Sequence, residues 1–132
     1  MKNNVNLIGH VGKDPDIKVF DTGSKVARFS LATTENYKNK NGEWQKITQW
    51  HTVVGWKKQA DFIEKYIKKG ALIDVEGKIT YRKYEDKDGS TIYATEIVIN
   101  KLLPLFKIER NEQKPQTQDT QPNEQQNDDL PF

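Results

Sequence analysis

A single helical segment interrupts a chain of strand-like segments, and this arrangement limits the folds that the chain can adopt. The segment KKQADFIEKYIKKG, residues 57–70, places apolar side chains at i, i+1, i+4 and i+5, which is one face of a helix. Two lysines near its end suit the negative pole of the helix dipole, and Gly70 is the expected stop. The predicted apolar face consists of Phe62, Ile63, Tyr66 and Ile67.

Strand-like patterns lie on both sides of this helix. The segments before it are rich in β-branched and aromatic residues, and the first of them contains glycines that indicate a bend. The segment after it alternates regularly between apolar and polar side chains, and a last segment returns beside it. The expected strands are residues 4–20, 25–37, 45–56, 71–84 and 91–106.

Two dipeptides predict tight turns between neighbouring strands. Asn41-Gly42 and Asp88-Gly89 are typical of β-hairpins because their residues tolerate a positive φ. The order is therefore three strands, one helix and two strands. A five-stranded, partly open barrel with this order is the OB-fold, and we predict this all-β class with one helix for residues 1–106. A plain β-sandwich would leave the helix unexplained.

The composition changes abruptly near Glu109 to glutamine, asparagine, proline and charged residues. Residues 107–127 lack the apolar area that would offset the entropy of ordering, so we expect a disordered linker. Residues 128–132 then restore apolar side chains after about 20 polar residues. Such an ending suits an apolar pocket with a basic lip on another protein, and its proline limits the entropy lost on binding. The predicted docking tip is Asp128, Asp129, Leu130, Pro131 and Phe132.

The net charge of +2 conceals an uneven distribution of charges. The part from residue 107 onward holds three basic and six acidic residues, which leaves 18 basic and 13 acidic residues, or +5, in residues 1–106. A basic body with an acidic tail favours a polyanionic partner for the body. The chain has no apolar run long enough to span a membrane and no signal-peptide pattern at its start.

Patterns that indicate catalysis are absent from the sequence. There is no cysteine, and the two histidines, His10 and His51, have no metal-ligand spacing. Neither a phosphate-binding glycine loop nor a nucleophile motif occurs. We therefore expect a protein that is not an enzyme and that needs no metal or other cofactor.

Aromatic and basic residues occur together in several segments, such as NYKNKNGEW, GWKKQ and TYRKYEDK. Proteins that hold single-stranded nucleic acids need this pairing, because cations neutralise phosphates and rings stack on unpaired bases. An ordinary core role competes with this interpretation for some rings. The apolar periodicity favours a core or interface position for Phe29, Phe62, Tyr66 and Tyr81, and Trp44 fits a stacking ring or a plain loop residue equally well.

Three stretches and the tail carry a resemblance to a known family. NLIGHVGKDPDIKVFDTGSKVARFSLAT, QWHTVVGWKKQADFIEKYIKKGALIDVEGKI and YRKYEDKDGSTIYATEIVIN, followed by the DDLPF ending, resemble the bacterial and phage single-stranded DNA-binding proteins. The resemblance implies binding of single-stranded DNA without sequence specificity during replication, recombination and repair. It also implies a cytoplasmic homotetramer whose tip recruits other proteins of these processes.

The resemblance assigns roles to individual residues. The stacking rings that it implies are Tyr37, Trp50, Trp56 and Tyr84, of which the two tyrosines are smaller than the family's usual tryptophans. Thr52 stands where some members have arginine, so one phosphate contact is expected to be missing. His51 matches a histidine at the family's subunit interface, and an ordinary buried histidine is the competing interpretation. The implied phosphate-binding residues are Lys58, Lys68, Arg82 and Lys83.

Two other functions remain open from the sequence. An OB-fold replication accessory or RNA-binding module would share the barrel, although such relatives generally lack the acidic tip. A small OB-fold nuclease would need clustered carboxylates, a metal and a facing arginine, and the chain has only Arg28, Arg82 and Arg110.

Overall fold

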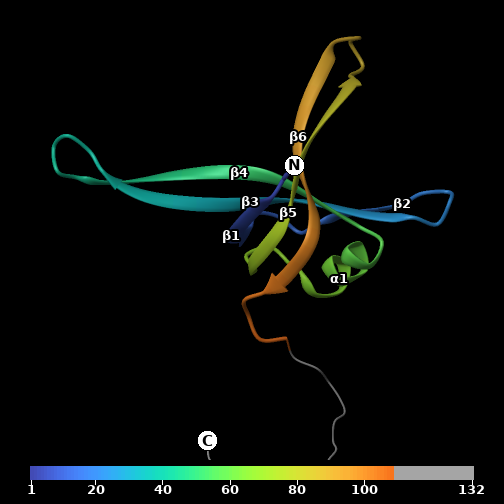
Figure 1. The fold of residues 1–132 in the computed structure, drawn as a ribbon, viewed down its shortest axis with the longest axis horizontal. Coiled ribbons are helices and arrows are strands. Elements are labelled where there is room, and N and C mark those ends of the chain that lie inside the picture. The colour runs from blue at the N-terminus through green and yellow to red at the C-terminus, as the bar shows by residue number, and fades with distance from the viewer. Residues whose placement is uncertain (109–132) are drawn as a thin grey trace, which may run out of the picture.

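The computed structural model of the protein describes residues 1–108 (Figure 1). The predicted linker and tip, apart from residues 107–108, lie outside the described residues. Six strands and one helix follow one another along the chain. They are β1 (Val5–Val11), β2 (Asp16–Val19), β3 (Lys25–Lys38), β4 (Trp44–Trp56), α1 (Lys58–Tyr66), β5 (Leu72–Glu85) and β6 (Thr91–Pro104).

Five of the strands close into a barrel, which confirms the predicted OB-fold. The order in the sheet is β1-β5-β6-β4-β3-β2, and β1 also pairs with β3 through His10–Ala32 and Val11–Leu31, which closes the barrel and leaves β2 outside it. All these pairs are antiparallel except that between β4 and β6, which joins Val53 to Ile97 and Val54 to Val98. The single first strand expected from the sequence is divided into β1 and β2. The division falls at residues 12–15, where Pro15 has no N–H to continue a ladder.

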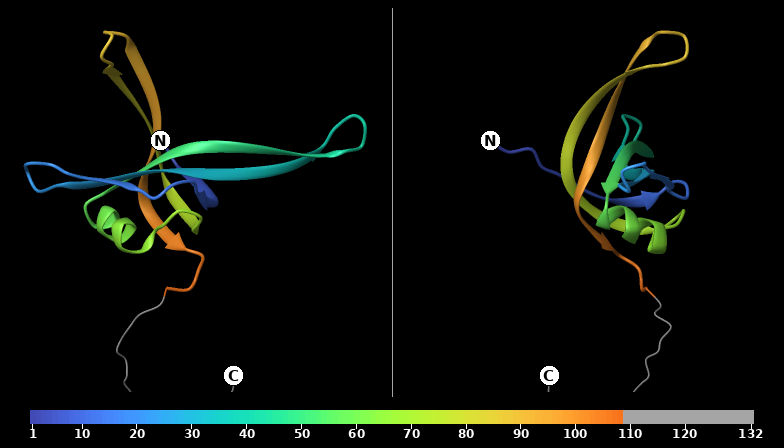
Figure 2. Two further views of the ribbon diagram at one scale, coloured as in Figure 1. Left: turned by 180° about the vertical axis from the view of Figure 1, so that it is seen from behind. Right: turned by 90° about the vertical axis from the view of Figure 1, so that its right-hand side faces the viewer.

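Two long hairpins leave the barrel in different directions (Figures 1 and 2). The β3–β4 pairing runs without interruption from Val26–Trp56 to Lys38–Trp44, and the β5–β6 pairing ends at Glu85–Thr91. Both predicted turns are confirmed, with φ values of 83° at Gly42 and 81° at Gly89. We call the parts of these hairpins beyond the barrel the β3–β4 arm (residues 34–48) and the β5–β6 arm (residues 81–95).

Alternation along the strands builds the core inside the barrel. Side chains of one parity point inward from each strand, and α1 covers the barrel end away from the β5–β6 arm (Figure 2). Phe29 and Ile63 are buried as predicted, but Tyr81 is 76% exposed and does not belong to the core. By residue 81, β5 has left the barrel, and no second layer formed by the described residues covers it. The core comprises Val11, Ala27, Phe29, Leu31, Val53, Ala60, Ile63, Ile67, Ile73, Val75, Ile97 and Ile99.

The helix ends before the predicted stop. Ile67 has extended backbone angles, and its N–H still donates to the carbonyl of Ile63. The Ile67 side chain is buried in the core, so the chain turns there to reach β5. Gly70 has a φ of 89° and its N–H donates to the carbonyl of Val11, so this glycine serves the link to the barrel rather than the helix end.

Candidate functional site

Large rings lie exposed on the surface, where they do not contribute to the core. The four rings singled out from the sequence, Tyr37, Trp50, Trp56 and Tyr84, are all exposed, with Trp50 at 62% and Trp56 at 42%. Trp44 is exposed as well. Exposure of such rings leaves apolar faces open to solvent, which favours a stacking role over a packing role.

The outer face of β4 carries both predicted tryptophans. Trp50, Thr52, Val54 and Trp56 alternate with the inward-pointing Val53, so they share one face of the strand. The Trp50 ring lies close over Gly12, where an added Cβ would come within 2.5 Å of a ring carbon. The glycine therefore leaves the space that the ring occupies. A shallow pocket at this end is lined by Gly12, Lys13, Ser30 and Trp50.

Trp56 forms the other end of this face together with a ring that the sequence analysis missed. Phe20 stacks on Trp56 with 5.9 Å between the ring centroids and 15° between the planes. The amino group of Lys18 lies 5.0 Å from the centre of the Phe20 ring. The available signal was an apolar ring at the end of an expected strand, just before the connection at residues 21–24, because no packed core is expected there. Phe20 fixes one side of Trp56 and leaves the rest of the indole exposed.

A carboxylate shared by two arginines lies beside Trp56. The Oε2 atom of Glu96 accepts hydrogen bonds from Nη2 of Arg82 at 2.8 Å and from Nη2 of Arg28 at 3.1 Å. The Arg82 hydrogen bond lowers the pKa of Glu96 against an opposing effect of desolvation, and Arg28 lowers it further. The same hydrogen bond raises the pKa of Arg82. The pocket around the cluster is lined by Lys18, Phe20, Val26, Arg28, Val54, Trp56, Arg82 and Glu96.

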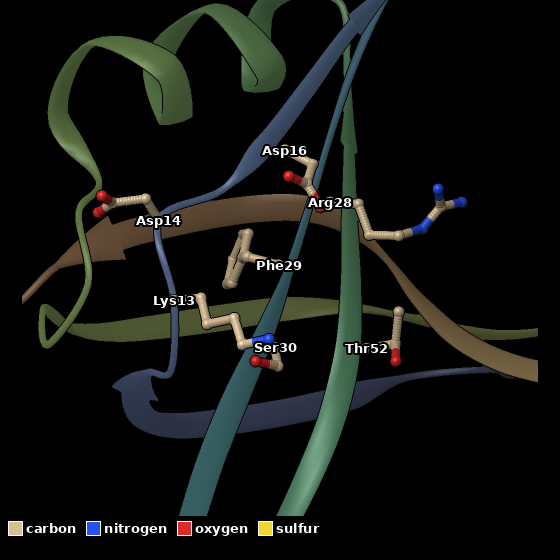
Figure 3. A pocket seen from close by; sticks show the side chains of 7 residues that line it. All are labelled: Lys13, Asp14, Asp16, Arg28, Phe29, Ser30 and Thr52. Carbon is tan, nitrogen blue, oxygen red and sulfur yellow. The ribbon is translucent and has the colours of Figure 1, made fainter.

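A third pocket joins the two ends of the face (Figure 3). Phe29 is among its lining residues, and Figure 3 shows Arg28 extending away from Lys13 on the side of Thr52. Asp14 has a structural contact, because its Oδ1 accepts a hydrogen bond from the backbone N–H of Lys69. The three pockets make one surface from Trp50 to Arg82, which we call the groove. This third pocket is lined by Lys13, Asp14, Asp16, Arg28, Phe29, Ser30 and Thr52.

The structure brings together four of the eight residues predicted to contact nucleic acid. Trp50, Trp56 and Arg82 line the groove, and Tyr84 continues it on the β5–β6 arm, where its ring lies 5.1 Å from the Arg82 guanidinium. Arg82 and Tyr84 share one face of β5 because they lie two residues apart.

The other four lie elsewhere. Tyr37 is on the opposite face of the β3–β4 arm from Trp50, and Lys83 is on the opposite face of β5 from Arg82, since strand faces alternate. Lys58 begins α1 just after Trp56. Lys68 lies in a pocket at the far end of the helix with Tyr66 and Phe106.

His51 lies on the inward parity of β4, next to Leu31 in the ladder. Its Nε2 lies 2.8 Å from the Thr33 hydroxyl, and the ring is half-buried. A role at a subunit interface remains a prediction. Within residues 1–108, no group of three acidic, histidine or cysteine side chains is arranged to hold a metal ion. The one helix of that part is too short and too polar to cross a membrane.

Comparison with known proteins gives consistent matches across the described part of the chain. The family model described as the single-strand binding protein family matches residues 2–105. Single-stranded DNA-binding protein 1 of Chlorobaculum tepidum is 44% identical over 97 residues, which are 73% of this chain and 60% of that protein. The single-stranded DNA-binding protein of Bacteroides thetaiotaomicron is 45% identical over 102 residues, 76% of this chain and 63% of that protein. The chain thus spans about 60% of the length of such relatives.

A solved structure extends the similarity to three dimensions. A Plasmodium falciparum SSB determined in complex with single-stranded DNA superposes with a TM-score of 0.72 at 38% sequence identity. The superposition covers 80% of this chain and 96% of that one.

Proposed function

Because the chain belongs to the single-strand binding protein family, we propose that it binds single-stranded DNA without sequence specificity. The observation that carries this proposal is the groove, where exposed tryptophans and arginines share one surface. Each stacked base contributes about 1–3 kcal/mol, and any base offers a face to a ring. The family and the groove also support a binding protein rather than an enzyme.

The mechanism divides the work between rings and cations. Bases stack on Trp50, Trp56 and Tyr84, while Arg82 neutralises phosphates in the groove. Lys58, at the start of α1 just after Trp56, neutralises phosphates beyond the groove. Stacking needs unpaired base faces, so a duplex, whose bases are already stacked, gains only the phosphate contacts. Tyr37 and Lys83 lie on the far faces of the two arms, so a strand that reaches them passes around an arm.

We further propose that the protein forms a homotetramer. The outer face of β1, β5 and β6 presents Ile8 and Leu103, both more than half exposed, on either side of Asp74 in the ladder. Such an apolar patch on a sheet suits contact with another copy. His51 is the interface residue that the family resemblance proposes. Four grooves on one particle would let a single strand wrap, and the number engaged would depend on salt.

The proposed cellular role is protection of single strands in the cytoplasm during replication, recombination and repair. The tip, Asp128, Asp129, Leu130, Pro131 and Phe132, is proposed to recruit the enzymes of these processes. A chain lacking residues 128–132 should keep its affinity for DNA but lose binding to such enzymes. Loss of DNA affinity in that variant would contradict a separate docking role for the tip.

Titration with oligo-dT tests the central proposal. The protein's tryptophan fluorescence should be quenched strongly, with a site size that changes with salt, and duplex DNA of equal length should quench little. An unchanged fluorescence, or equal binding of duplex, would contradict the stacking mechanism. Competition by oligo-rU tests the RNA-binding alternative, because an RNA-binding module would prefer the RNA strand.

A further inference from the structure

Glu96 is the feature of the groove that the proposed function does not yet use. Its side chain is only 8% exposed, whereas the Arg28 and Arg82 side chains that it binds are 42% and 47% exposed. The three residues come from three different strands, β6, β3 and β5. One buried carboxylate thus fixes the positions of two solvent-accessible cations.

The contact geometry leaves most of each guanidinium available. Both arginines reach the same oxygen, Oε2, and each uses Nη2 for it. An arginine carries five N–H donors in a planar fork, so each retains donors for another acceptor. The Nε–H of Arg28 is buried and has no acceptor among the described residues. The donors that the groove presents are therefore the remaining Nη N–H groups of the two partly exposed side chains.

Arg28 lies between the two tryptophans of the groove. Trp50 and Trp56 are six residues apart on one strand, a separation of about 20 Å. Arg28 pairs with Val54 in the ladder, so it is about 7 Å along the strand from the Trp56 position. A strand that stacks on both rings must carry its backbone past Arg28.

The charges around Arg28 leave a net positive site. Asp16 pairs with Arg28 across the β2–β3 ladder but forms no ion pair with it, and Asp14 and Glu96 contribute two further negative charges. Lys13, Lys18, Arg28 and Arg82 contribute four positive charges to the same walls, which leaves a net charge of +1. A phosphodiester is the anion that a bound DNA strand brings to this place.

We propose that Arg28 is a phosphate-binding residue of the groove, acting with Arg82, and that Glu96 is the positioning residue that orients both. This inference rests on the proposed binding of single-stranded DNA. It gives Glu96 a role opposite to that expected from its charge. A carboxylate beside a polyanion should weaken binding, whereas a carboxylate that orders two guanidinium forks should strengthen it.

Salt dependence tests the role of Arg28. Relative to the full wild-type chain, R28Q should make the negative slope of log affinity for oligo-dT against log salt shallower by about 0.7, the value for one phosphate contact. Affinity at low salt should fall about tenfold, as expected for the loss of charge-assisted hydrogen bonds. K101Q removes the same charge from β6 beside Glu76, toward the other end of that strand from Glu96, and should leave the slope unchanged. Equal slopes for R28Q and wild type, or equal losses in R28Q and K101Q, would overturn the assignment.

Two substitutions of Glu96 test positioning. E96A should weaken oligo-dT binding several-fold although it removes a negative charge, while E96Q, which keeps an oxygen acceptor, should restore most of the affinity. In a chain that also carries R28Q and R82Q, E96A should have no further effect. Tighter binding by E96A, or an undiminished effect in the triple variant, would overturn the positioning role. If E96A fails to fold, as judged by circular dichroism, E96Q decides in comparison with wild type. A positioning role requires E96Q to bind oligo-dT somewhat more weakly than wild type, whereas tighter binding by E96Q would show that the carboxylate only repels the strand and would overturn the role. If the wild-type chain does not bind oligo-dT, the proposed function itself is refuted. If the wild type binds but the variants do not differ as expected, only the roles of Arg28 and Glu96 are refuted.

Discussion

The long strands run from the barrel into the arms, and their side chains alternate between two faces in both parts. One face is covered by the core in the barrel, whereas neither face is covered by the core in the arms. In β3, Phe29 and Leu31 point into the barrel and are buried, whereas Tyr37, on the same parity, is exposed in the β3–β4 arm. In β5, Val75 is buried and Tyr81, six residues later, is 76% exposed. Alternation places a side chain on a face, and the presence of a second layer decides whether that face is covered.

Removal of a barrel side chain should have the largest effect on stability. Leu31→Ala should lower the free energy of unfolding by about 2–5 kcal/mol, because a fully buried leucine leaves a cavity in a closed barrel. Tyr93→Ala, in the arm part of β6, should change it by less than about 0.5 kcal/mol, as the ring is 78% exposed. Urea denaturation followed by circular dichroism measures both. Similar losses for the two variants would show that the arm ring is covered in solution, for instance by another subunit.

Removal of a groove ring should affect DNA binding more than stability. Trp50→Ala and Trp56→Ala should each weaken oligo-dT binding by about 1–3 kcal/mol, the value of one stacked base. The free energy of unfolding should change less, and more for Trp56 than for Trp50, since only Trp56 stacks on Phe20. Anisotropy of a labelled oligonucleotide gives the affinities. Leu31→Ala, measured at a temperature where it is folded, is the matched control and should bind as wild type does.

The sequence predicted the barrel better than the groove, and the reason is physical. Strand alternation, two turn dipeptides and one amphipathic helix are local signals, and together they admit few closed arrangements. The groove depends on contacts between distant parts of the chain. Phe20 meets Trp56 across 36 positions, and Arg28 meets Glu96 across 68. No local pattern encodes which polar residues converge there, so Arg28 and Glu96 were not singled out.

The predictions that the structure contradicts failed for the same reason, because each depends on contacts between distant parts of the chain. Tyr81 fits the alternation of buried residues, but periodicity does not show where the barrel ends and the arm begins. Gly70 is a common helix stop, but the burial of Ile67 ends α1 earlier. Lys68 and Arg82 are both basic and close to aromatic residues in the sequence, and only the fold separates them onto different surfaces.

Acid should selectively weaken the junction between barrel and arm, where Glu96 lies. The folded pKa of Glu96 is lowered from the usual 4.5, so its contribution to stability is present above pH 4.5 and is lost as the pH falls through the lower folded value. The loss should be about 1 kcal/mol, since both arginine partners are partly exposed to solvent. The difference in unfolding free energy between wild type and E96Q, followed from pH 7 to pH 3, isolates this carboxylate from the others. A difference that does not change with pH would contradict the ion-pair contribution.

Changes at the arm tips should have the smallest effect, and they show how independent the arms are of the barrel. Gly42→Ala forces a side chain into a φ of 83°, at a cost of about 1 kcal/mol to the turn. Among residues 1–108, apart from the two chain neighbours, no atom lies within 4 Å of the added Cβ, so the strain is confined to the local backbone. A frayed tip would relieve that strain without opening the barrel, because the core contacts of β3 and β4 begin far from the turn. Global unfolding should therefore shift by less than the cost of the turn, while amide exchange at residues 39–43 should accelerate. If the free energy of global unfolding instead fell by the full cost of the turn, the arm and the barrel would unfold as one cooperative unit. The difference in burial between them would then not make the arm independent of the barrel.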